Sequence, residues 1–269
     1  GFPAGASTDV AARAVAQKMS DIAGQQFVVE NRPGASSNIA TEQVARAPAD
    51  GYTLLVGTIA NTINPSFQAN LPFDFTKDFA PVGMIGSVPN FLVVHPSMKA
   101  SSMAELIAEA KSRPGQITYA SSGNGTAPHL SGELFASMAG IKLVHVPYRG
   151  SSPAVTDLLA GQVQAMFSPA STVLPHIRSG KLRALATTGA SRSAAAPDLA
   201  TVSELGLAGF ETSVWFGLVA PANTPAEVVG RLSELLGAAL DDPQIRRQFA
   251  AQAIDTVKAG PGDFSRYIA

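Results

Sequence analysis

Apolar positions near the start of the chain change spacing several times, and each change predicts a new element. Residues 8–23 are predicted to form an amphipathic helix that Gly24 ends, because apolar side chains recur there at helical spacing. Residues 26–30, QFVVE, are rich in β-branched side chains and predict a short strand before the turn NRPG. A second helix over 38–47 and a strand over 52–57, YTLLVG, follow.

The same alternation continues through the middle of the chain. We expect strands over 91–95, 117–120, 142–147, 165–168 and 182–188, and helices over 103–112, 128–139, 153–160 and 173–179. Strict alternation of strands and helices is typical of an α/β class in which mostly parallel sheets are flanked by helices. A last helix is expected to begin at Asp263 or Phe264.

The number of expected strands favours two lobes over one. A single open sheet in a chain of this length does not comfortably hold them all. The runs FLVVHP and WFGLVAP bracket a self-contained set of strands and helices, and we expect them to be crossover strands that join the lobes. Lobe 1 is then residues 1–92 plus 214–269, and lobe 2 is residues 93–213.

Composition narrows the classes of partner. The chain has 269 residues, 46% hydrophobic and 14% charged, with a net charge of −1, which suffices for a well-buried core. Nucleic acid is not an expected partner, because no block of Lys or Arg is present. The longest apolar runs are far below the roughly 20 residues that cross a bilayer, so direct membrane insertion is not expected.

Signals for a metal, a cofactor or a secretion signal are missing from the sequence. With no cysteine, disulfides and thiolate sites are excluded, and the four histidines lack zinc-site spacing. Neither G-x-G-x-x-G nor G-x-x-x-x-G-K-[ST] occurs, so no cofactor is expected. The chain starts inside a loop rather than with a signal peptide, and we interpret both ends as trimmed.

A glycine-rich stretch, SSGNGTAPHL at 121–130, leaves one expected strand and enters a helix. Gly123 and Gly125 allow close backbone approach, Ser122 and Thr126 offer hydroxyl groups, and the helix start offers unpaired N–H groups to an anion. An equally weighted interpretation is a tight connection in which Thr126 is a simple N-cap. Both interpretations stay open from the residues alone.

The first residues, GFPAGASTD, have the same organisation. Ser7 or Thr8 is expected to be the N-cap of the first helix, and Asp9 in its first turn is interpreted as structural. The preceding residues present mainly backbone groups, which can bind a ligand without adding charge. Sparse aromatic residues lie at or beside expected strand ends and could wall a pocket; they are Phe2, Tyr148, Phe167, Trp215 and Phe216.

Catalytic patterns are weak. No G-x-S-x-G elbow occurs, which disfavours a serine hydrolase, although a hydrolase using Ser122 with His129 stays open as an alternative. His129 is placed in the first turn after the glycine-rich stretch and is expected to face the same cleft. A structural role is the better interpretation for the other histidines, His95, His145 and His176.

Five segments together resemble a known family. FPAGASTDVAAR, VENRPGASSNIATEQVARAPADGYTLL, YASSGNGTAPHLSGELF, VPYRGSSPAVTDLLAGQVQAMF and WFGLVAPANTPAEVVGRL resemble, in this order, marker segments of the Bug-type substrate-binding proteins of tripartite tricarboxylate transporters. The resemblance covers nearly the whole chain. It implies a two-lobed, periplasmic-binding-protein-like α/β fold and a monomeric protein that is not an enzyme.

The resemblance also implies a function and a location. Such a periplasmic protein closes on a small carboxylate and hands it to a membrane permease, without a metal or cofactor. A dicarboxylate, an acidic amino acid and an aromatic acid all stay open as ligands, and a carboxylate-sensing module is a further alternative. The family has a signal peptide and a strand before FPAG, neither of which is in this sequence.

Carried over by position, the resemblance implies a set of ligand-binding residues in both lobes. They are Phe2, Ala4, Ala6, Ser7, Thr58, Asn61, Ser122, Gly123, Thr126, His129, Ser168 and Phe216, with Tyr148 in the wall. Arg149 is either a ligand partner or a turn residue. The family usually has Gly-Gly where this chain has Gly5-Ala6, and the extra methyl group is expected to narrow the pocket. Our hypothesis is that two helix starts, one per lobe, bind the carboxylates without a dedicated arginine.

Overall fold

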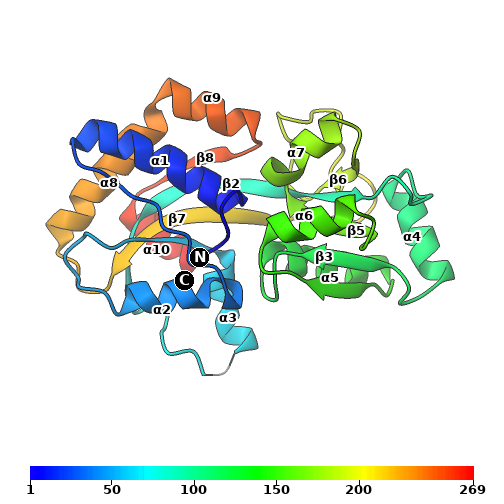
Figure 1. Cartoon of the computed structure of the whole chain (residues 1–269), viewed down its shortest axis with the longest axis horizontal. Helices are drawn as coiled ribbons and strands as arrows, with labels where there is room; N and C mark the ends of the chain where they lie inside the picture. Colours follow the sequence, from blue (N-terminus) through cyan, green and yellow to red (C-terminus); the bar gives the residue numbers. More distant parts are fainter. Residues whose placement is uncertain (69) are drawn as a thin grey trace. The chain divides into compact units, whose positions relative to one another are not determined.

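Two strands carry the chain from one part of the molecule to another. The computed structural model describes residues 1–68 and 70–269 (Figure 1). It divides into unit 1, made of Gly1–Ser87 and Trp215–Ala269, and unit 2, made of Val88–Val214. The chain passes between them within β2, Phe79–Val94, and again near the start of β7, Ser213–Pro221.

Unit 1 is built on antiparallel strand pairs. β1, Leu55–Thr58, pairs with β7, and the first half of β2 pairs with β8, Asp255–Ala259. The helices of unit 1 are α1 Ser7–Ala23, α2 Asn38–Ala45, α3 Ile59–Phe67, α8 Ala226–Asp241, α9 Pro243–Ala251 and α10 Pro261–Ile268, with a short 3₁₀ turn at Ala35–Ser37.

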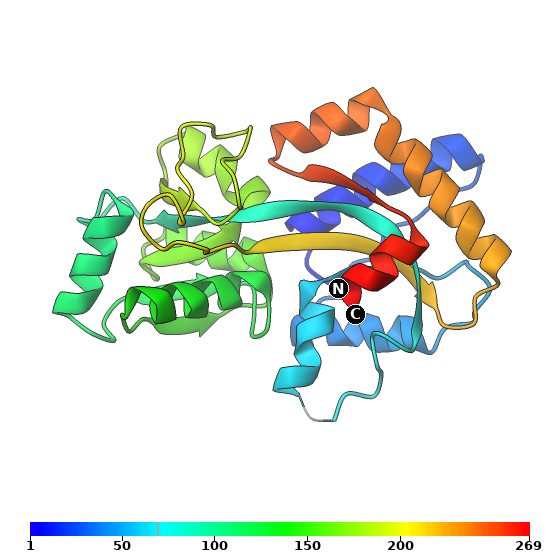
Figure 2. The same ribbon diagram turned by 180° about the vertical axis from the view of Figure 1, so that it is seen from behind.

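The last helix is fixed to the sheet of unit 1 by aromatic packing. Figure 2 shows α10 lying across the strands of this unit. Phe264 on α10 packs edge-on against Trp215, with ring centroids 5.6 Å apart. A Cβ atom at Gly217 on β7 would stand 2.0 Å from the Phe264 ring, so only glycine admits the helix at this distance.

Unit 2 contains the parallel strands. β3, Thr118–Ser121, pairs in parallel with β4, Val144–Pro147, and with β5, Ala165–Pro169. The end of β2 pairs antiparallel with β5 and with β6, Arg183–Thr187. The helices of unit 2 are α4 Met103–Ser112, α5 Ala127–Ala139, α6 Ser151–Leu159 and α7 Ala170–Arg178.

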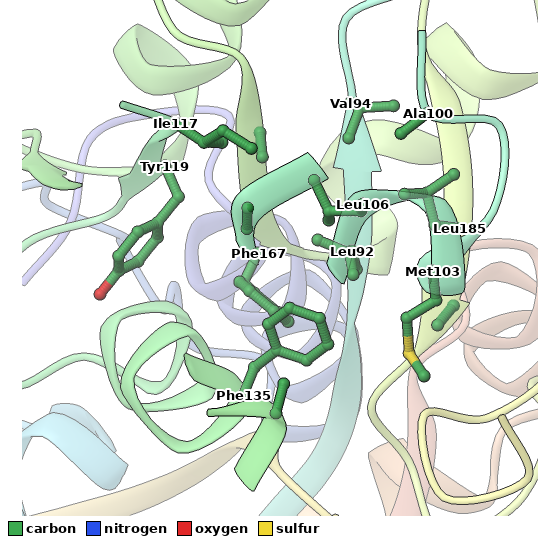
Figure 3. Close-up of a cluster of buried hydrophobic side chains, with 14 of the residues drawn as sticks. Leu92, Val94, Ala100, Met103, Leu106, Ile117, Tyr119, Phe135, Phe167 and Leu185 are labelled. Atoms are coloured by element: carbon green, nitrogen blue, oxygen red, sulfur yellow. The ribbon is translucent and has the colours of Figure 1, made fainter. Parts of the chain in front are cut away.

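A buried cluster holds α5 against β3 and β5 in unit 2. Figure 3 shows Phe135 of α5 beside Phe167 of β5, whose ring centroids are 5.6 Å apart. Phe135, Phe167 and Tyr119 are each fully buried. Burial of such side chains contributes about 1.5 to 3 kcal/mol each, so the cluster fixes the strand and the helix that flank the glycine-rich stretch.

Strand direction refines the expected fold class. The α/β class is confirmed, and the strands of unit 2 that are joined by helical crossovers, β3, β4 and β5, are parallel as expected. The pairs that involve β2 are antiparallel, as are β1 and β7, so the sheets are mixed rather than mostly parallel. β2 enters unit 2 directly from unit 1, so no helical crossover precedes it in that unit.

One expected strand is wrong. Residues 26–30 have no strand pairing among the described residues, and Val28 is 81% exposed. The β-branched composition of a segment does not supply the neighbouring strand with which its backbone must pair. Here the Phe27 N–H donates instead to the Ser20 hydroxyl, at 2.8 Å.

Candidate functional site

The loop before α1 ends in a helix start without a side-chain cap. The N-cap is Ala6, so the expected N-cap at Ser7 or Thr8 is wrong by one or two positions. Asp9 causes the difference, because its Oδ2 accepts the Gly5 N–H at 3.0 Å and closes the turn from inside the helix. Gly5 has φ 78°, a conformation that glycine adopts without strain.

Asp9 is the centre of the polar contacts below this loop. Its carboxylate accepts hydrogen bonds from Arg13 Nε at 3.0 Å and from Asn31 Nδ2 at 2.8 Å, and Asn31 Nδ2 also donates to the Phe2 carbonyl oxygen at 3.1 Å. Burial raises the pKa of Asp9, but the hydrogen bonds and the Arg13 charge together lower it below its ordinary value. The structural interpretation of Asp9 agrees with these contacts.

The turn from β1 into α3 contains Thr58 and Asn61, both expected to bind ligand. Thr58 N donates to Asn61 Oδ1 at 2.8 Å, and Ala60 N donates to Thr58 Oγ1 at 3.3 Å, which forms a capping box. Asn61 Nδ2 donates to Thr41 Oγ1 at 2.7 Å. One polar end of Asn61 therefore holds the turn and the other joins it to Thr41 on α2, a partner that no sequence pattern indicated.

The remaining expected residues of unit 1 are distributed between its first loop and β7. Phe2 is half-buried and Ala4 exposed, whereas Ala6 and Ser7 are buried. Phe216 is fully buried on β7 and stands opposite Thr58 in the antiparallel register.

In unit 2 the glycine-rich loop, defined here as residues 121–126, joins β3 to α5. Gly123 and Gly125 have φ values of 129° and 72°, which L side chains rarely adopt. The Ser121 hydroxyl accepts the Gly123 N–H at 3.1 Å, and Gly125 N donates to His129 Nδ1 at 3.1 Å. The glycines thus permit a backbone turn that side chains on both flanks hold in place.

Thr126 occupies the N-cap of α5 but does not cap the helix with its side chain. Its hydroxyl donates to the Gly123 carbonyl oxygen at 2.7 Å, so it closes the glycine-rich loop instead. The interpretation of Thr126 as a simple N-cap is therefore right about its position, but wrong about its side chain, which does not bond the helix start. Because the helix start has no side-chain cap, the backbone N–H of Ala127 is a potential anion donor, whereas Pro128 at the next position has no N–H.

Two histidines and a tyrosine form a stack beside the glycine-rich loop. The ring centroids of His129 and His145 are 4.2 Å apart, and those of His145 and Tyr119 are 4.9 Å apart. His145 Nε2 lies 2.6 Å from Ser121 Oγ, and the Tyr119 hydroxyl donates to Glu133 Oε1 at 2.6 Å. Sequence analysis assigned His145 a structural role but could not show that it contacts this loop.

Burial sets the protonation of the stack. It lowers the pKa of His145 to about 4, with a further lowering from His129, and it lowers the pKa of His129, while Glu133 opposes both shifts. Burial and the Glu133 contact raise the pKa of Tyr119. Both histidines are therefore neutral at neutral pH.

The other expected residues of unit 2 lie at the same edge of its parallel strands. Ser122 follows β3, Tyr148 follows β4, and Ser168 is in β5; Ser122 and Ser168 are buried. Carboxyl ends of parallel strands are a common ligand-binding edge in α/β proteins. The Tyr148 hydroxyl donates to Asp157 Oδ2 at 2.7 Å, and Arg149 is exposed.

A cavity of about 530 Å³ lies elsewhere in unit 2. Its apolar walls include Phe91, Ile177, Leu182 and Leu199, with Arg183 beside them. The residues expected to bind ligand do not line this cavity. It is therefore distinct from the glycine-rich loop.

The described part of the chain gives no support to a metal site, a membrane-spanning helix or a serine nucleophile at His145. Residues 1–68 and 70–269 contain no cluster of His, Asp and Glu side chains suited to a metal ion. They also contain no helix long and apolar enough to cross a membrane. The serine hydroxyl in contact with His145 is that of Ser121, which is fully buried and so inaccessible as a nucleophile.

The fold defines a class of protein, since it is that of periplasmic solute-binding proteins. The model of the family described as tripartite tricarboxylate transporter family receptor matches residues 11–269. Protein BugT of Bordetella pertussis is 40% identical, over 100% of this chain and 83% of that protein. The chain therefore belongs to this receptor family.

Two solved structures with carboxylates in their descriptions are similar over nearly the whole chain. "R. palustris Rpa4515 with adipate" is 37% identical with a TM-score of 0.97, over 99% of this chain and 90% of that one. MatC of Rhodopseudomonas palustris with bound malate is 28% identical with a TM-score of 0.92, over 99% and 92%. These relatives are solute-binding proteins and give no support to the hydrolase alternative.

Proposed function

We propose that this chain is a periplasmic receptor that binds a small dicarboxylate without converting it and delivers it to the membrane permease of a tripartite transporter. The observation that carries the proposal is a pair of helix starts, at α1 and α5, that both follow a glycine-containing loop and have no side-chain cap. Relatives described with adipate and malate support a dicarboxylate over an acidic amino acid or an aromatic acid.

The loop before α1 in unit 1 and the glycine-rich loop in unit 2 are each proposed to bind a carboxylate group. The backbone N–H groups of Ser122 and Ala127 and the hydroxyl groups of Ser7 and Ser122 are the candidate donors, whereas the Ala6 N–H already donates to the Pro3 carbonyl oxygen. A hydrogen bond to a charged group contributes about 1.5 to 3 kcal/mol, and micromolar affinity corresponds to about 8 kcal/mol. Four or five such bonds suffice when the loops are already ordered.

The remaining expected residues are proposed to shape the site rather than to bind the charged groups of the ligand. Phe2, Ala4, Tyr148 and Phe216 would contribute walls, while Thr58, Asn61 and Ser168 would hold backbone in place. A binding site made of neutral groups also suits a delivery protein, which must release its ligand. We propose that the protein acts as a monomer.

Calorimetry with adipate, malate, glutamate and benzoate tests the proposal on the full chain. We expect saturable binding of adipate or malate at one site per chain, and mass spectrometry of the recovered acid should show no chemical change. Tighter binding of benzoate than of both dicarboxylates would overturn the ligand class. Conversion of any bound acid would overturn the assignment as a receptor.

A matched pair of glycine variants tests the site. Gly125→Ala should weaken binding at least tenfold, because an added Cβ strains the φ of 72° in the glycine-rich loop. Gly140→Ala adds comparable strain at φ 61°, but at the far end of α5 where a Cβ meets no neighbour. It should lower stability and leave affinity unchanged.

A further inference from the structure

The glycine-rich loop is fastened to unit 2 at two histidine nitrogens. Gly125 N donates to His129 Nδ1 at 3.1 Å. Ser121 Oγ lies 2.6 Å from His145 Nε2 and also accepts the Gly123 N–H at 3.1 Å. One histidine therefore contacts the loop backbone directly, and the other contacts it through a single hydroxyl group.

The contact at His129 requires an unprotonated nitrogen. A ring nitrogen accepts a hydrogen bond only through its lone pair, so Nδ1 cannot carry a proton while it accepts the Gly125 N–H. Protonation would place two N–H groups against each other at this point. The hydrogen bond to Gly125 is thus conditional on the charge of His129.

The contact at His145 couples the second ring to the same loop. Ser121 is fully buried, and its hydroxyl has one hydrogen to share between His145 Nε2 and the Gly123 carbonyl oxygen at 3.2 Å. In the neutral tautomer whose Nε2 accepts the Ser121 hydroxyl, a proton added to Nε2 would turn this nitrogen into a donor and redirect that hydroxyl. The Ser121 hydroxyl, which accepts the Gly123 N–H, would then change its own hydrogen bonds.

Stacking joins the two histidines into one unit. The rings lie 4.2 Å apart at an interplanar angle of 27°, so two positive charges on the pair would repel strongly. The ionisable groups that face the pair are Glu133 on α5, which favours their charged forms, and Tyr119 on β3. The Tyr119 hydroxyl donates to Glu133 and supports the stack from the buried side.

We propose that His129 and His145 are positioning residues that hold the glycine-rich loop in its binding conformation while both are neutral, and that protonation of the pair releases the loop. The positioning part stands on the contacts of unit 2 alone. Its consequence, weaker carboxylate binding in acid, rests on the proposed function.

Hydrogen exchange of the Gly125 amide tests the positioning without any ligand. Its protection factor, measured by NMR on the full chain, is expected to fall as the pH is lowered below neutrality. His129→Ala removes the acceptor and should lower the protection factor about threefold to tenfold at neutral pH, the worth of one hydrogen bond. An unchanged protection factor in this variant would overturn the proposal.

A double variant separates charge from structure. In His129→Asn with His145→Gln, amide groups replace the two contacting nitrogens without being able to take up a proton. Protection should match the parent at neutral pH and no longer fall in acid. If the protection factor of the double variant still falls in acid as in the parent, protonation of the pair is not the cause and the proposal is wrong. This comparison tests the proposal even if His129→Ala does not fold.

His95→Asn is the matched control. His95 Nδ1 accepts the Ser97 N–H at 3.2 Å in unit 2, outside the glycine-rich loop. This variant should retain the acid-dependent loss of protection at Gly125. If it abolishes that loss, the effect does not belong to the His129–His145 pair.

The affinity for adipate and malate, measured on the same variants, tests the functional consequence. Binding should weaken in acid for the parent and the His95→Asn variant, and less steeply for the double variant, in which protonation of the ligand's own carboxylates is the remaining cause. If neither acid binds at any pH while the Gly125 amide behaves as expected, the proposed ligand is wrong and the positioning stands. If binding is strong but the amide does not respond to pH, the positioning is wrong.

Discussion

The two loops present the same feature, a helix start without a side-chain cap, but different chemistry supports them. Below the loop before α1, an ionised carboxylate, Asp9, accepts hydrogen bonds from Gly5, Asn31 and Arg13. Beside the glycine-rich loop, neutral rings of His129, His145 and Tyr119 stack and share their hydrogen bonds with the backbone. The loop before α1 therefore depends on Asp9 staying ionised. The glycine-rich loop depends on His129 and His145 staying neutral.

This difference shows how a helix start without a side-chain cap can be supported in two ways. The Asp9 charge is matched by Arg13 at 3.0 Å, so little net charge reaches a ligand. The histidine stack reaches the same neutrality by burial, which disfavours the protonated rings. Acid affects the two supports in separate pH ranges, so variants can distinguish them.

The largest expected effect tests the stack through its packing. Gly132→Ala places a Cβ atom 2.2 Å from Cε2 of the fully buried Tyr119 ring. Overpacking of this kind lowers the free energy of unfolding by about 3 kcal/mol, and urea denaturation measures it. The glycine-rich loop should loosen in parallel, seen as faster exchange of the Gly125 amide.

Gly237→Ala is the control for that variant. Gly237 also lies inside a helix, α8, but a Cβ atom there meets no neighbour. Alanine has the higher helix propensity, so this variant should be stabilised by up to about 1 kcal/mol. Equal effects of the two substitutions would mean that contact with Tyr119 does not limit position 132.

Local patterns predicted much of the fold. The helices α1, α4 and α5 were expected within one or two residues of their bounds, because apolar spacing and end signals such as Gly24 are properties of the segment itself. The strand over 26–30 was wrong, and antiparallel pairing of β2 was missed, because both depend on neighbours distant in the sequence. The elements α3, α8, α9 and β8 were not assigned.

The candidate site was predictable in place but not in its contacts. The glycines at 123 and 125 and the following helix start could be recognised because they are adjacent in the sequence. The stack of Tyr119, His145 and His129 could not, since it depends on the parallel register that places Tyr119 opposite His145. Which residues contact a ligand stays a prediction.

The second effect concerns the charge below the loop of unit 1. Asp9→Asn leaves Arg13 without its ionic partner and weakens hydrogen bonds that a carboxylate accepts, so unfolding should become easier by about 2 kcal/mol in urea. Glu30→Gln breaks an exposed ion pair with Arg32 as a control. This control should change stability by less than about 1 kcal/mol, and a loss equal to that of Asp9→Asn would contradict the assigned role of Asp9.

The third effect is a dependence on pH that separates the two supports. Since His145 has a pKa lowered to about 4, the unfolded chain takes up a proton first, and stability falls as the pH drops from about 6.5 toward 4. Asp9 has a lowered pKa, so its contribution is complete above its ordinary value and is lost only in stronger acid. Urea midpoints across both ranges measure this.

His145→Gln and Asp9→Asn serve as controls for each other in these titrations. The first should reduce the loss between about pH 6.5 and 4 to the part that comes from His129, and leave the lower range unchanged. The second should do the reverse. If Asp9→Asn flattened the upper range, the two loops would share one support and the contrast between them would be wrong.

The smallest expected effect concerns the wall residue Tyr148. Burial, together with the Asp157 contact, raises the pKa of the Tyr148 phenol to about 12. Tyr148→Phe loses this hydrogen bond, worth about 1 kcal/mol of stability, but keeps the ring. Because the hydroxyl is proposed to bond Asp157 and not the ligand, the dissociation constants of adipate and malate, measured by calorimetry, should stay within about twofold. Loss of a hydrogen bond to the ligand would change them by more. A tenfold weakening would show that the hydroxyl contacts the ligand, and would contradict the role of Tyr148 as a wall residue.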